Sequence, residues 1–125
     1  MSELTWAGDQ RRFRLGIDEL LALQDKLDAG PAEIAGRLRD GTWRVQDLQE
    51  IFRISLIGGG LEPKKAKALI DTHIVPGKLA SHVLMAWAIV ANAIHGDEAD
   101  PVGKPEAETE APIGSPQPPS TETAS

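Results

Sequence analysis

The sequence predicts a mainly α-helical protein: a small bundle of about five helices with a short N-terminal β-hairpin and a disordered C-terminal tail. Three observations support this prediction. Apolar residues recur at three- and four-residue spacing in five segments, as in helices that bury one face. An alternating apolar and charged run stands near the N-terminus, as in a half-buried strand. Large apolar residues become rare after Gly96, so we expect a helical domain over residues 1–96 and a tail over residues 97–125.

The composition narrows the classes of function. The chain has 125 residues, enough for one modest core, and no cysteine, which excludes disulfides and thiolate chemistry. The first residues lack the pattern of a signal peptide. The most apolar run, residues 83–91, is about half of the roughly 20 residues that span a bilayer. We therefore expect a cytoplasmic protein with no membrane partner.

The net charge of −6 is unevenly distributed. Residues 1–96 contain 12 Asp/Glu and 12 Lys/Arg, whereas residues 97–125 contain 7 Asp/Glu and a single lysine, Lys104. A balanced domain with an acidic tail argues against a general nucleic-acid binder. The tail is rich in Pro, Glu, Thr and Ser and cannot bury enough apolar surface to offset its ordering entropy, which predicts disorder.

The hairpin is expected where Phe13 and Leu15 alternate with arginines, with residues 7–10 as its turn. A lone hairpin is marginally stable, so it must lie on the helices or on a partner's sheet. Its three arginines fit either a phosphate-contacting edge or, as we prefer, a charged face that discourages edge-to-edge association. They are Arg11, Arg12 and Arg14.

Two helices follow the hairpin. The first runs from Ile17 to Ala29, with two carboxylates in its first turn, where the helix dipole favours them. The second runs from Pro31 to Arg39 and has proline at its first position. The side chains expected to be buried are Leu20, Leu21, Leu23 and Leu27 on the first helix and Ile34, Ala35 and Leu38 on the second.

The apolar spacing of residues 43–60 predicts one helix that ends at three glycines, Gly58 to Gly60. Glycines end a helix because glycine adopts the left-handed C-cap conformation without a steric penalty. The polar residues of this helix, Asp47 among them, are expected to face water. The inward stripe is expected to hold Val45, Leu48, Ile51, Phe52 and Leu56.

Two further helices complete the prediction. The helix from Pro63 to Ile74 turns Ala66, Leu69 and Ile70 inward and Lys64, Lys65 and Lys67 outward. The helix from Lys78 to His95 is apolar nearly all round, with Leu79, Val83, Trp87, Val90 and Ile94 on one face and Leu84, Met85 and Ile89 on another. Such a helix is either central to the fold or half covered by a partner, and the small domain slightly favours the partner.

Several candidate sites are set aside, and we expect no enzyme activity, no cofactor and no metal. The glycines do not form a phosphate loop, since a helix precedes them and Lys65 is followed by Ala66. The imidazoles of His73, His82 and His95 lack the i, i+4 spacing of a helical metal site. Ser55 stands within a helix and has no nucleophile-elbow motif.

Residues 46–74 superficially suggest a helix-turn-helix, with lysines at the start of the second helix. The balanced charge of the domain and its acidic tail argue against DNA binding, which stays a less favoured alternative. Retention of DNA in a low-salt gel shift would support that alternative.

Five short segments together resemble the gene transfer agent family of small tail proteins. They are residues 13–17, 29–31, 43–45, 56–61 and 63–66, and the leucine, isoleucine and three glycines of residues 56–60 are the most specific part. Proteins of this family resemble phage tail assembly chaperones, and the family is also described as phage tail tube protein. The resemblance implies a non-enzymatic role in tail morphogenesis.

A chaperone of this kind would bind the tape measure protein until tail tube subunits polymerise around it. The alternative, a structural tube component, is less favoured, because tube subunits are typically β-sandwiches and at most one hairpin is expected here. For the chaperone, the expected partner-binding residues are Phe52, Leu56, Ile57, Met85, Trp87 and Ile89. Ordinary core packing is the alternative for each of them, and Trp6 and Trp43 fit either role.

Overall fold

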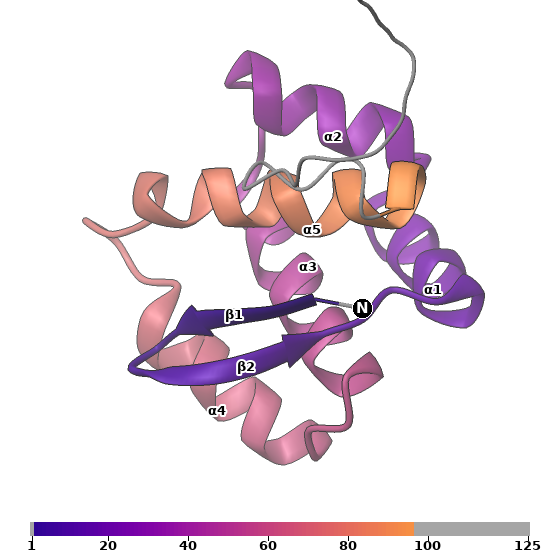
Figure 1. The fold of residues 1–125 in the computed structure, drawn as a ribbon. Helices are drawn as coiled ribbons and strands as arrows, with labels where there is room; N and C mark the ends of the chain where they lie inside the picture. Colours follow the sequence, from indigo (N-terminus) through magenta and orange to yellow (C-terminus); the bar gives the residue numbers. More distant parts are fainter. Residues whose placement is uncertain (1, 97–125) are drawn as a thin grey trace, which may run out of the picture.

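The computed structural model describes residues 2–96, and the predicted acidic tail lies outside the described residues. The described part contains one β-hairpin and five α-helices, which confirms the predicted fold class (Figure 1). The strands are β1 (Ser2–Trp6) and β2 (Asp9–Phe13). The helices are α1 (Ile17–Leu27), α2 (Pro31–Asp40), α3 (Val45–Gly58), α4 (Pro63–His73) and α5 (Val83–His95), and a 3-10 turn, Ala80–His82, precedes the last.

The hairpin closes through a two-residue loop at Ala7 and Gly8, whose φ angles of 56° and 79° are those of a type I′ turn. Trp6 pairs with Asp9 beside this loop, and Ser2 pairs with Phe13 at the other end. Trp6 and Phe13 are buried, whereas Arg12 is exposed. The hairpin therefore lies on the helices, in front of α3 in Figure 1. Of the two alternatives expected for a marginally stable hairpin, helices or a partner's sheet, the structure shows the helices.

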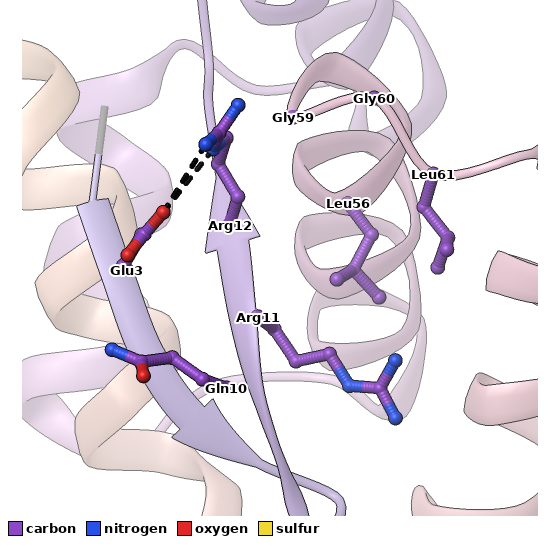
Figure 2. A pocket seen from close by; sticks show the side chains of 8 residues that line it. All are labelled: Glu3, Gln10, Arg11, Arg12, Leu56, Gly59, Gly60 and Leu61. Carbon is purple, nitrogen blue, oxygen red and sulfur yellow. Dashed lines mark hydrogen bonds and ion pairs between the residues drawn. The ribbon is translucent and has the colours of Figure 1, made fainter.

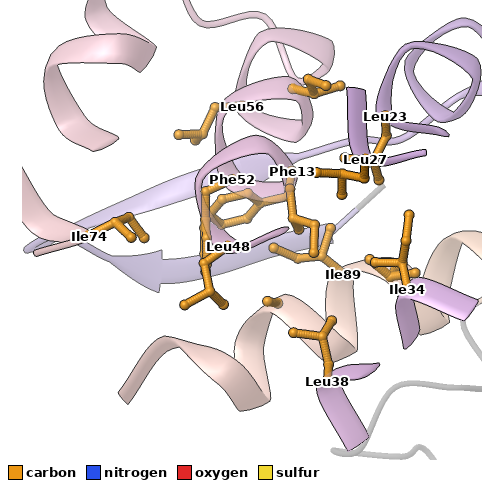
Figure 3. Close-up of a cluster of buried hydrophobic side chains, with 14 of the residues drawn as sticks. Phe13, Leu23, Leu27, Ile34, Leu38, Leu48, Phe52, Leu56, Ile74 and Ile89 are labelled. Carbon is orange, nitrogen blue, oxygen red and sulfur yellow. The ribbon is translucent and has the colours of Figure 1, made fainter. Parts of the chain in front are cut away.

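Helix α3 is the centre of the fold, since it packs against β2, α1, α4 and α5. Helix α5 in turn lies between α2 and α3, as Figure 1 shows. A helix held on two sides by its own chain is central to the fold, so the apolar character of α5 is explained mainly by burial within the domain. Figure 3 shows the core that results, in which Phe13, Phe52, Leu48 and Ile89 meet side chains of α1 and α2.

The helices differ from the prediction mainly at their ends. Helix α1 stops at Leu27, because Asp28 adopts a left-handed conformation with φ of 52°. Helix α3 begins at Val45, two residues after the predicted start, and α5 begins at Val83 after a separate 3-10 turn. These differences shorten the helices and leave their order unchanged.

Most of the expected buried side chains are buried, but several are not. Leu21 and Val45 are 56% and 45% exposed, although both were expected on inward stripes. Ile94 is 39% exposed near the end of α5. The prediction that Asp47 faces water is also wrong, because its side chain is fully buried and forms an ion pair with Arg37 at 3.0 Å.

Candidate interaction surface

Phe52, one of the six expected partner-binding residues, is fully buried. Its ring stacks on Trp6 with 4.7 Å between ring centroids and meets Phe13 edge-on at 5.9 Å. These aromatic contacts join α3 to the hairpin. Phe52 therefore packs the core, which is the alternative that the sequence left open for it.

Leu56 and Ile89 are also buried in the core, with exposed fractions of 1% and 5%. A partner cannot reach either side chain in this fold. The other three expected residues, Ile57, Met85 and Trp87, are half-buried and keep part of their surface accessible. Two of these three lie in the first turns of α5.

The most exposed large apolar side chain of α5 is Leu84, at 71%. It lies three residues before Trp87, so these two side chains are neighbours on the surface of the helix, whereas the side chain of Met85 is turned about 100° away from that of Leu84. We call Leu84 and Trp87 the α5 patch. The sequence placed Leu84 on a second apolar face of this helix, which was the signal that could have identified it.

Two exposed apolar residues on α1 were not among the partner-binding residues expected from the sequence. Ile17 and Leu21 are 72% and 56% exposed and lie four residues apart, hence one turn apart on the helix. The buried face of the same helix is formed by Leu23 and Leu27. Because four leucines fall within eight residues of α1, either side of this helix could have been the buried one. Only the packing of α1 on α3 decides which leucines are buried.

The glycine turn does not offer donors for a phosphate. The N–H of Gly59 donates to the carbonyl oxygens of Ser55 and Leu56, and the N–H of Gly60 donates to that of Ile57 at 2.9 Å. Leu61 donates to Leu56 at 3.0 Å, which completes a Schellman motif with Gly60 at φ of 109°. The backbone donors of this turn are thus used within α3, as expected for a helix terminator.

A pocket lies beside this turn, between β2 and the end of α3 (Figure 2). Arg12 reaches across the hairpin to Glu3 at 3.3 Å, and Arg11 donates through Nε to the carbonyl oxygen of Trp6 at 3.4 Å. Arg14 pairs with Glu19 at 3.1 Å. Because each of the three arginines already has a partner within the chain, the charged-face interpretation of the hairpin is favoured over a phosphate-contacting edge.

His82 bridges two distant parts of the chain. Its Nδ1 lies 3.1 Å from the indole Nε1 of Trp6, and its Nε2 lies 2.9 Å from the carbonyl oxygen of His73. Trp6, which fitted either a core or an interface from the sequence, is therefore a core residue. Among residues 2–96, no cluster of three or more His, Cys, Asp and Glu side chains is arranged to hold a metal ion.

Ser55, the one hydroxyl considered for catalysis, is buried and donates to the carbonyl oxygen of Ile51 at 2.6 Å. That hydrogen bond occupies the hydroxyl within its own helix. At the start of α4, Lys64 and Lys65 are exposed, and Lys67 pairs with Asp71 at 2.8 Å. None of the helices among the described residues is long and apolar enough to cross a membrane.

Comparison with known protein families agrees with the resemblance seen in the sequence. Residues 2–96 match the family described as phage tail tube protein, GTA-gp10. The chain belongs to this family. The match covers all of the described structure, so the hairpin and the five helices together are the family's domain. No curated protein and no solved structure matches the chain.

Membership of this family makes the chain a phage-tail-related protein. Its partners are to be sought among proteins of the tail. The family description names a tail protein and no enzymatic activity. It includes the word tube, which bears on the choice between the two roles that the sequence left open.

Proposed function

We propose that the protein is a tail assembly chaperone that binds the tape measure protein in the host cytoplasm and leaves as tail tube subunits polymerise. The observation that carries this proposal is the scarcity of β-structure. Within residues 2–96, the strands are one hairpin of two five-residue strands. A subunit that pairs its sheet edges into rings needs more strand than this hairpin supplies.

The packing of the hairpin supports the same choice. The end of β2 is taken up by α3, because the N–H of Arg14 donates to the carbonyl oxygen of Ser55 at 2.9 Å. The chain around Arg12 also runs directly against Gly59. This end of the strand is therefore not free to pair with a neighbouring subunit.

The α5 patch is the proposed contact with the tape measure protein. Leu84 and Trp87 present an apolar helix surface, which suits the packing of one helix against another. Met85 on α5 and Ile57 at the end of α3 are two further half-buried candidates. Phe52, Leu56 and Ile89 would act behind these residues, by holding α3 and α5 in place.

A structural tube component is the second candidate function, and the family description favours it. Quantitative mass spectrometry of purified particles separates the two roles. A chaperone is expected to be missing from mature particles and to be bound to tape measure protein in lysates. Many copies in each particle would instead make the protein part of the tube.

A further inference from the structure

The outward line of α1 combines apolar and acidic side chains. Ile17 and Leu21 occupy its first turns, and Asp25 and Asp28 continue the same line at i+4 and i+7 from Leu21. Asp18 lies beside them, and all five side chains are exposed. We call these five residues the α1 face; it is opposite to Leu23 and Leu27, which bury the helix on α3.

The carboxylates of the α1 face have no cationic partner among the described residues: the ion pairs of residues 2–96 do not include Asp18, Asp25 or Asp28. Two of the three, Asp25 and Asp28, also stand at the C-terminal end of the helix, where the helix dipole disfavours negative charge. Lys26 is the single basic residue in that last turn. The helix dipole favours Asp18 in the first turn, but it does not account for Asp25 and Asp28 at the other end.

We propose that the α1 face binds an amphipathic helix of another protein whose apolar stripe is flanked by lysine or arginine. Ile17 and Leu21 would pack against that stripe, and the three carboxylates would face its basic residues. This proposal deepens the chaperone function and rests on it for the expectation that the partner is a helical protein.

Charge excludes three other occupants. A second copy of the chain would bring the same acidic face against itself. The segment of residues 97–125 is itself acidic, with 7 Asp/Glu against one lysine. An anionic lipid surface would also repel three carboxylates. A basic helix is the occupant that satisfies both the exposed aliphatic pair and the unpaired acids.

The test uses the full-length protein and two synthetic helical peptides with identical leucine spacing. One peptide carries lysines beside its leucine stripe, and the other carries glutamates at the same positions. In amide NMR spectra the lysine peptide is expected to shift residues 17–28, whereas the glutamate peptide leaves them unchanged. Shifts confined to residues 97–125, or equal binding of both peptides, would overturn the proposal.

Two variants sharpen this test. The double change Asp25→Lys and Asp28→Lys should weaken binding of the lysine peptide about tenfold and favour the glutamate peptide. Leu21→Ser should weaken binding of the lysine peptide, while Leu84→Ser, at an exposed leucine of α5, should not. Each variant is first checked for a dispersed spectrum. Failure of the peptides would refute this site alone, because the chaperone role is judged separately by the copy number in particles.

Discussion

Gly58 lies directly against the backbone carbonyl oxygen of Arg14, so closely that a β-carbon at residue 58 would overlap that oxygen. Gly59 has the same relation to the carbonyl oxygen of Arg12. The end of α3 and the end of the hairpin thus meet backbone to backbone. Only Gly60, with φ of 109°, fills the left-handed position for which all three glycines were predicted.

Gly58→Ala and Gly59→Ala should each lower the free energy of unfolding by about 1–3 kcal/mol, because the strand must move away from α3. Urea denaturation of the full-length protein measures this change. Gly36→Ala is the matched control. It lies inside α2 with its nearest neighbour, Arg39 Nη2, 3.6 Å from an added β-carbon, so it should raise stability by about 0.5–1 kcal/mol. Equal effects at all three positions would contradict the close contact.

Asp47→Ala should cost about 3–5 kcal/mol of unfolding free energy, because it leaves the guanidinium of Arg37 largely buried without this carboxylate. The same side chain accepts the N–H of Arg44 at 2.8 Å and so caps α3. Asp71→Ala is the control, since it removes an exposed ion pair with Lys67 and should cost no more than about 1 kcal/mol. Urea midpoints that coincide for the two variants would refute the structural role of Asp47.

His82 should carry its ring proton on Nε2. The indole N–H of Trp6 can only donate, so Nδ1 of His82 must accept, and Nε2 then donates to the carbonyl oxygen of His73. Long-range proton–nitrogen NMR correlations identify the tautomer directly. The exposed His95 serves as the reference for a ring without this constraint. A proton found on Nδ1 of His82 would mean that the bond to Trp6 does not exist.

Leu84→Asp should abolish retention of tape measure protein from lysates while changing the unfolding free energy by no more than about 0.5 kcal/mol, since the side chain is 71% exposed. Ala32→Asp, an exposed change on α2, should leave both quantities unaltered. Ile89→Ala, in contrast, should cost about 2–5 kcal/mol of stability, because Ile89 is buried. Retention of the tape measure protein by the Leu84→Asp variant would exclude the α5 patch as its binding site.

The fold class and the order of elements could be predicted because they depend on local signals. Pro31 and Pro63 open helices at their first positions, and Gly60 closes one, as the sequence indicates. Each of these residues acts on backbone within a few positions of itself, so its meaning is visible in a short window.

What could not be predicted depends on partners that are distant along the chain or on a choice between helix faces. Asp47 looked like a solvated residue, and its burial requires Arg37 on another helix. Gly58 and Gly59 looked like terminators, and their closeness to residues 12–14 arises only after the hairpin has packed. The apolar residues of α1 and α5 outnumber the places that the core offers them, so the sequence alone could not separate Leu21 from Leu23 or Leu84 from Ile89.

The position of α5 between α2 and α3 also bears on the order in which the chain can fold as it is synthesised. Within residues 2–96, every other element is synthesised before α5, yet α2 and α3 cannot cover their apolar surfaces until α5 is available. The hairpin also depends on this late segment, because Trp6 donates a hydrogen bond to His82 just before α5. Fragments that stop before Val83 should therefore remain unfolded, and the nascent chain keeps its apolar surfaces open until almost all of the domain has been translated.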